Sequence, residues 1–173
     1  MNKLSALSTS IALLSGLATF LAVGPLNGLF LIWAATIAWA AFFFLGGDKS
    51  ALKNTINCGI FGVFMAWIGA IQITNISSNP TLGFAFMAAV SVLASVLVMC
   101  LAASIDRFSC IPASVLGYSS LFAYLLQTPA QLDKSILFNM SISNPALLVS
   151  ISIIIGAYFG QYSALLANKL TKS

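Results

Sequence analysis

The chain has 173 residues, of which 60% are hydrophobic and only 6% are charged, with a net charge of +4. A soluble domain carries about 25% charged residues, so this composition excludes a water-exposed fold and indicates a protein surrounded by lipid. Without His or Glu, the chain lacks the groups for His-based metal sites and most acid–base catalysis, so we expect no enzyme activity, metal or cofactor. The cations are scattered, which does not favour nucleic-acid binding, and the cysteines at 58, 100 and 110 match no standard metal spacing.

Apolar runs free of charged residues recur along the chain. They lie at about 4–23, 28–45, 56–74, 82–104, 111–127 and 146–167. Because a membrane-spanning helix needs about 20 residues, these runs predict an all-α polytopic membrane protein. We expect one domain, 1–173, folded as a compact bundle of six transmembrane helices with the lipid bilayer as its main partner.

Turn-forming residues separate these runs. Gly24-Pro25 follows the first run, and Gly46-Gly47 follows the second, where a helix end favours a residue without Cβ. Ser50 is then a candidate cap for a third helix that begins before the hydrocarbon does. The first run is long enough to span, so we interpret it as a helix rather than as a cleaved signal peptide.

The Lys and Arg residues predict the orientation, since cytoplasmic loops carry an excess of them. With six spans, only Lys134 lies on one side. The other side collects Lys3, Lys49, Lys53, Arg107, Lys169 and Lys172. Both termini are therefore expected in the cytoplasm.

The segment 128–145, on the opposite side, is too apolar to lie freely in water. It is expected to form a short interfacial helix or to fold back over the bundle. An interfacial loop and a lid over a pore are both compatible with its composition.

Small residues recur every four positions in several runs, which places them on one helix face and allows close backbone approach. The last run contains Gly156 and Gly160, which we predict at a helix–helix contact inside the chain; a homo-oligomer interface is the alternative. Weak internal similarities fit either a parallel repeat, with an offset of 58 residues, or an inverted three-plus-three repeat, both of which occur in transporters.

Hydroxyl groups gather in the C-terminal half. Ser95, Ser114, Tyr118 and Tyr158 are candidates for lining a narrow polar path between the fourth, fifth and sixth helices. A buried Tyr hydroxyl needs a hydrogen-bond partner. The alternative is that each Ser hydroxyl bonds a carbonyl of its own helix, one turn back, and that no path exists.

Several short motifs resemble a known family. They are Leu14-Ser15-Gly16, the run from Trp39 to Phe43 leading into Gly46-Gly47-Asp48-Lys49, Met99-Cys100, the run Phe108 to Pro112 followed by Gly117 and Phe122, and the run Gly156 to Gly160. Together they are similar to the small bacterial inner-membrane proteins catalogued as domain of unknown function 1097. This resemblance implies a bacterial inner-membrane location and a multi-helix fold, with no substrate or catalytic residue to carry over.

Two functions fit these observations. The first is a passive channel or facilitator for a small uncharged solute, because ion-coupled transporters usually keep an ionisable group within the membrane and none lies inside these runs. Hydroxyls and backbone groups can select a solute by pore width and hydrogen bonding. The second is a non-transporting membrane scaffold or accessory subunit.

Overall fold

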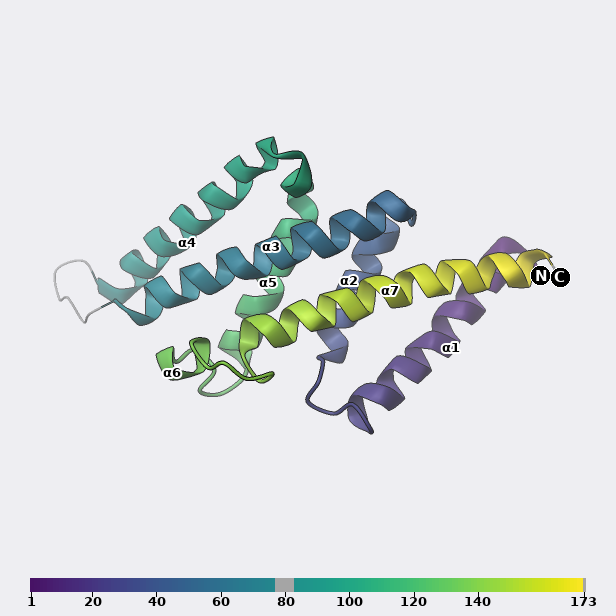
Figure 1. The fold of residues 1–173 in the computed structure, drawn as a ribbon, viewed down its shortest axis with the longest axis horizontal. Coiled ribbons are helices and arrows are strands. Elements are labelled where there is room, and N and C mark those ends of the chain that lie inside the picture. Colours follow the sequence, from purple (N-terminus) through teal and green to yellow (C-terminus); the bar gives the residue numbers. More distant parts are fainter. Residues whose placement is uncertain (77–82, 173) are drawn as a thin grey trace. The chain divides into compact units, whose positions relative to one another are not determined.

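The structure, a computed structural model, describes residues 1–76 and 83–172. Over these residues the chain is helical and contains no strand, which confirms the predicted all-α class (Figure 1). The long helices are α1 (Lys3–Val23), α2 (Ile32–Phe44), α3 (Lys49–Thr74), α4 (Gly83–Leu101), α5 (Ile111–Gln127) and α7 (Pro145–Lys172). The short ones are the 3-10 turns η1 (Ala102–Ser104) and η2 (Asp106–Phe108) and the single turn α6 (Lys134–Leu137).

Four of these helices are long and apolar enough to cross a membrane: α1, α3, α4 with the following turn, and α7. The two other long helices, α2 with 13 residues and α5 with 17, are shorter. At about 1.5 Å per residue they measure about 20 and 26 Å, against a hydrocarbon core of about 30 Å. The helix lengths therefore support a multi-span membrane protein and give four clear candidates where the apolar runs predicted six.

The helix ends differ from the apolar runs at several places, among them the starts of α2 and α3. Helix α2 begins at Ile32, four residues after the start of the run, because Gly28 adopts a φ of +82° and the chain turns there. Helix α3 begins at Lys49 and is capped by Asp48, whose carboxylate accepts the Ala51 N–H at 2.7 Å; Ser50 was the expected cap. Residues 77–82 lie outside the described residues, and they include Leu82, the predicted start of the fourth span.

The chain divides into two units. Unit 1 comprises residues 1–56 and 151–173, and unit 2 comprises residues 57–150. In unit 1, α2 and the C-terminal part of α7 run in the same direction. The Ser152 hydroxyl accepts the Leu31 N–H at 2.8 Å, and the Trp39 indole donates to the Ser163 hydroxyl at 3.0 Å.

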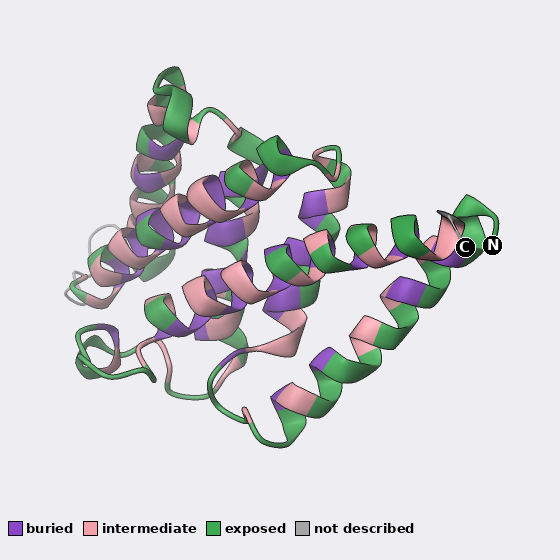
Figure 2. Cartoon of the chain, turned by 45° about the vertical axis from the view of Figure 1, so that its right-hand side comes forward, coloured by how far each residue is buried: buried purple, intermediate pink, exposed green. Residues whose placement is uncertain are grey.

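Helix α1 joins unit 1 in the opposite direction. The Ser10 hydroxyl donates to the Ser163 carbonyl at 2.8 Å, and the N-terminal ammonium of Met1 donates to the Leu170 carbonyl at 3.4 Å. The two ends of the chain therefore lie side by side (Figure 1). The rest of α1 is mostly exposed (Figure 2), with buried positions at Ala6, Ala18 and Ala22.

Small residues set the closest helix contact in unit 1. Gly156 on α7 lies against α2, and a Cβ at this position would overlap the carbonyl group of Ala35. Gly160 lies one turn further on, where a Cβ would be 2.7 Å from Cδ1 of Phe42. Both glycines are buried inside unit 1, so their missing side chains allow α2 and α7 to approach each other.

Candidate functional site

Unit 2 is built on a second close crossing, between α3 and α5. A Cβ at Gly117 would overlap the carbonyl group of Gly59, and one at Gly62 would overlap the carbonyl group of Ser114. The backbones are therefore in direct contact, which is the geometry that small residues give to helix pairs in lipid. This contact positions Tyr118, one residue after Gly117, deep in the unit.

The hydroxyl groups of Ser95 and Tyr118 meet inside unit 2. Ser95 on α4 and Tyr118 on α5 are both buried, and their oxygens lie 2.8 Å apart. Ser95 also bonds the Val92 carbonyl of its own helix at 3.1 Å. The buried Tyr hydroxyl thus has the partner that its burial requires, and the hydrogen bond joins α4 to α5.

Gly69 on α3 makes room for this pair. A Cβ at Gly69 would lie 3.0 Å from Oγ of Ser95 and 3.3 Å from the hydroxyl oxygen of Tyr118. Any larger residue would push against both hydroxyls. Three helices therefore meet at these three residues, and Gly69 is one that the sequence analysis did not single out.

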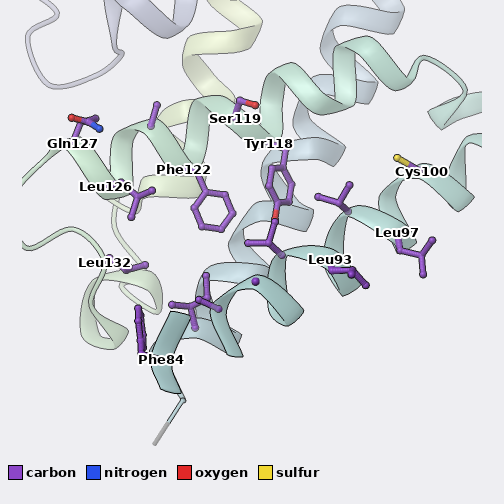
Figure 3. A pocket seen from close by; sticks show the side chains of 16 residues that line it. Phe84, Leu93, Leu97, Cys100, Tyr118, Ser119, Phe122, Leu126, Gln127 and Leu132 are labelled. Atoms are coloured by element: carbon purple, nitrogen blue, oxygen red, sulfur yellow. The ribbon is translucent and has the colours of Figure 1, made fainter. Parts of the chain in front are cut away.

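A pocket of about 1060 Å³ opens beside the hydroxyl pair, mostly between α4 and α5 (Figure 3). Its residues on α4 extend from Phe84 to Cys100 and those on α5 from Tyr118 to Gln127, with Ile73 and Leu132 completing the lining. Figure 3 shows the Tyr118 and Phe122 rings directed toward α4. Because α4 packs little of its surface against the rest of the chain, with Ser95 and Met99 as its buried residues, its pocket residues Phe84, Leu93 and Leu97 stay exposed.

The pocket lining is apolar with a few polar groups. Polar atoms come from Tyr118, Ser119, Gln127 and the thiol of Cys100, and none of the sixteen lining residues is charged. Binding sites for small molecules typically measure about 300–1,000 Å³ and combine an apolar wall with a few hydrogen-bonding groups. The pocket can accept an uncharged, largely apolar molecule with one or two hydrogen-bonding groups.

The candidate path residues fall into separate places. Ser95 and Tyr118 are brought together, whereas the buried hydroxyl of Ser114 bonds the Cys110 carbonyl of its own helix at 3.4 Å. Tyr158 belongs to unit 1, is 42% exposed and packs against the Tyr162 ring. Both serines bond carbonyls of their own helices, Ser114 that of Cys110 and Ser95 that of Val92, as the alternative describes. A path through all four residues stays a prediction.

The segment after α5 folds back onto α3. Leu137 is fully buried, and its carbonyl accepts the Trp67 indole N–H at 2.9 Å. The Phe138 ring meets the Trp67 ring edge-on, with centroids 5.8 Å apart. Both predicted elements occur, the short helix and the fold-back, and Leu132 from the same segment reaches the pocket. The sequence did not predict a partner for Trp67, although an indole N–H inside an apolar run signals a need for one.

The one-turn helix in this segment is fixed by Asp133. Its carboxylate accepts hydrogen bonds from both the hydroxyl and the N–H of Ser135. These bonds favour the charged form, so they lower the pKa of the Asp133 carboxyl below its ordinary value.

Thr55 is a further residue that the sequence did not single out. It is 2% exposed, and its hydroxyl is the one buried side-chain oxygen or nitrogen without a partner among the residues that the structure describes. A helical Thr can bond a carbonyl one turn back, which Thr55 does not do.

Comparison with known proteins yields one match. Residues 8–168 match the family model described as "Protein of unknown function (DUF1097)". No curated protein and no solved structure matches the chain. The match confirms the resemblance drawn from the short motifs.

Proposed function

The chain belongs to the DUF1097 family, and from this starting point we propose that it is a passive membrane facilitator for a small uncharged solute. The pocket of unit 2, with the Ser95–Tyr118 hydroxyl pair at its wall, is the observation that carries the proposal. The solute class follows from the lining: a molecule with mostly apolar surface and one or two groups able to bond Tyr118, Ser119 or Gln127.

Charge supports the passive mode of transport. Ion-coupled transport generally uses an ionisable side chain within the membrane, and none of the described residues that line the pocket is charged. Each net hydrogen bond to the solute contributes about 0.5–1.5 kcal/mol. A few such bonds in an apolar pocket give weak binding and rapid release, as conduction requires.

The proposal includes six spans with both termini in the cytoplasm of a bacterial inner membrane. Adjacent ends, at Met1 and Leu170, support an even number of spans. In a four-span arrangement, α2 and α5 do not cross the membrane. The cations would then divide three to four: one side would hold Lys3, Lys169 and Lys172, and the other Lys49, Lys53, Arg107 and Lys134. Six spans place six of the seven on one side, which is the bias expected of inner-membrane proteins.

The short helices can be accommodated. A hydrophobic segment shorter than the bilayer is tolerated by local thinning and by flanking residues, at a cost of fractions of a kcal/mol per Å. The turns before α2 also satisfy their backbone groups, since the N–H groups of Leu26 and Leu29 donate to Leu21 and Leu26 carbonyls at 2.9 and 3.0 Å.

Flux into liposomes tests the proposal. Purified protein would be reconstituted, and shrinkage and re-swelling would be followed by light scattering for a series of uncharged solutes of similar size and increasing apolar surface, such as urea, glycerol and short diols and amides. We expect the largest protein-dependent flux for solutes with more apolar surface. No protein-dependent flux for any member of the series would contradict the facilitator proposal.

A non-transporting scaffold or accessory subunit is the second candidate, and α1 favours it. Ser8, Ala12 and Gly16 lie one turn apart on this helix and are exposed, and no atom of unit 1 lies within 4 Å of a Cβ built at Gly16. Such a face allows close approach of a partner helix, including one from a second copy. Cross-linking through a cysteine at position 12, in a protein that shows no flux, would favour this second function.

A further inference from the structure

A smaller pocket in unit 2 is lined by one basic side chain, that of Arg107. It measures about 320 Å³ and lies between residues 57–64 of α3 and the turn η2. Its lining consists of Asn57, Ile60, Phe61, Phe64, Arg107 and Phe108. None of these residues belongs to the larger pocket, so the two are chemically separate sites.

Arg107 has a fixed backbone and an unpaired charge. The Cys58 thiol donates to the Arg107 carbonyl at 3.6 Å, and the neighbouring Phe108 ring stacks on Phe61 with centroids 4.3 Å apart. Arg107 itself is exposed, and across residues 1–76 and 83–172 its guanidinium makes no ion pair. A guanidinium presents a planar set of donors suited to phosphate, and here that set is available.

The pocket changes from polar to apolar along α3. Asn57, Phe61 and Phe64 follow one another at helical spacing, so they lie on one face of α3. The seven helical steps from Asn57 to Phe64 cover about 10 Å along the helix axis. At one end are the Asn57 amide and Arg107, and at the other the Phe64 ring is 50% exposed.

We propose that this pocket binds an anionic phospholipid. The phosphate contacts Asn57 on α3 and Arg107 in η2, and the first carbons of an acyl chain lie on Phe64. A free phosphate ion would use only the polar end of the pocket, whereas the charge at one end and the exposed ring at the other match the two parts of a lipid. The site does not depend on solute transport through the larger pocket.

Native mass spectrometry of the purified full chain tests the site. Phosphatidylglycerol and phosphatidylcholine with matched acyl chains would be titrated, together with inorganic phosphate as a competitor. We expect preferential retention of phosphatidylglycerol. Arg107→Gln should lower its affinity about fivefold, the effect of one basic residue near an anionic membrane surface, and leave phosphatidylcholine unchanged.

Two further variants separate the parts of the site. Asn57→Leu keeps the side-chain size and removes the amide, so it should also reduce the preference for phosphatidylglycerol. Phe64→Ala should lower the retention of both lipids. Lys3→Gln is the matched control, because it removes one cation from the exposed start of α1. Thermal melting without added lipid checks that each variant is folded.

The outcomes divide clearly. Loss of the preference in Arg107→Gln and Asn57→Leu, with Lys3→Gln unchanged, supports the site. An equal loss in Lys3→Gln would show a general effect of net charge and overturn the proposal. Displacement of phosphatidylglycerol by inorganic phosphate, with Phe64→Ala unchanged, would show a simple anion site and would also overturn it.

Discussion

The hydroxyl oxygens of Ser95 and Tyr118 lie 2.8 Å apart, buried between α4 and α5. These residues are 23 positions apart in the chain and share one hydrogen bond at the wall of the larger pocket. Gly69 on α3 makes room for them, because a Cβ there would lie only 3.0 and 3.3 Å from the two oxygens. The hydrogen bond therefore joins α4 to α5 and also places a polar group at the wall of the apolar pocket.

We expect Tyr118→Phe to change solute flux more than stability. The variant keeps the ring against Phe122, with which Tyr118 packs at a centroid distance of 5.0 Å, and removes only the hydroxyl. Interhelical hydrogen bonds in membrane proteins contribute about 0.6 kcal/mol on average, so the free energy of unfolding should fall by about that amount. Flux of the best solute in the liposome assay should change several-fold.

Ser120→Ala is the control for this variant. Ser120 is a buried hydroxyl on the same helix, it bonds the Leu116 carbonyl at 2.8 Å, and it does not line the pocket. Its flux should match that of the parent protein. If Tyr118→Phe and Ser120→Ala behave alike, the Tyr118 hydroxyl has no role in transport.

Gly156→Ala should destabilise the chain, and Gly156→Leu with Gly160→Leu should do so more strongly. The new Cβ at 156 would overlap the Ala35 carbonyl group, which cannot move aside as a flexible side chain can. Overpacked sites typically cost about 1–3 kcal/mol. The measurement is thermal melting in detergent, with the melting temperature expected to fall.

Gly16→Ala provides the matched comparison, since it makes the same chemical change in a helix where a Cβ at Gly16 meets no atom within 4 Å. Alanine has a higher helix propensity than glycine by about 1 kcal/mol. This variant should therefore melt at the same temperature as the parent or higher. Equal melting of Gly156→Ala and Gly16→Ala would contradict the close α2–α7 contact.

Local patterns predicted the helices well, and they predicted side-chain partners poorly. Apolar runs identify helices because lipid requires backbone groups to bond within their own segment. The start of α2 was missed because the conformation of Gly28, with φ of +82°, depends on the turn and not on apolarity. Ser95 and Tyr118 were both identified as buried hydroxyls, but the room for their pairing comes from Gly69 on α3, which no local pattern singled out.

Acidification should loosen the segment that packs on Trp67. The Asp133 carboxyl has a lowered pKa because Ser135 donates to its charged form. Its contribution is therefore complete above the ordinary Asp pKa of about 4 and is lost as the pH falls through the lower value in the folded protein. Because α6 leads to Leu137, which accepts the Trp67 indole N–H, Trp67 fluorescence should shift at low pH.

A Trp67-only background, with Trp33 and Trp39 replaced by Phe, isolates this signal. Asp133→Ala should show the low-pH fluorescence already at neutral pH and lose the pH dependence. Asp106→Ala, which removes an exposed carboxylate in η2, should keep it. A transition that persists in Asp133→Ala would assign the pH dependence to another group.

The number of spans can be decided with fusions at four positions. Adjacency of Met1 and Leu170 requires both termini on the same side, which either four or six spans satisfy. The two possibilities differ at α2: six spans place Leu26 and Gly47 on opposite sides of the membrane, and four spans place them together. Paired alkaline phosphatase and green fluorescent protein fusions after Leu26, Gly47, Phe108 and Ser173 distinguish them, since phosphatase is active only outside the cytoplasm and the fluorescent protein only inside it.

We expect phosphatase activity after Leu26 alone and fluorescence after the other three, because that arrangement keeps Lys49, Lys53 and Arg107 in the cytoplasm. Phosphatase activity after both Leu26 and Gly47 would show that α2, about 20 Å long, does not cross, and the six-span topology would then be wrong.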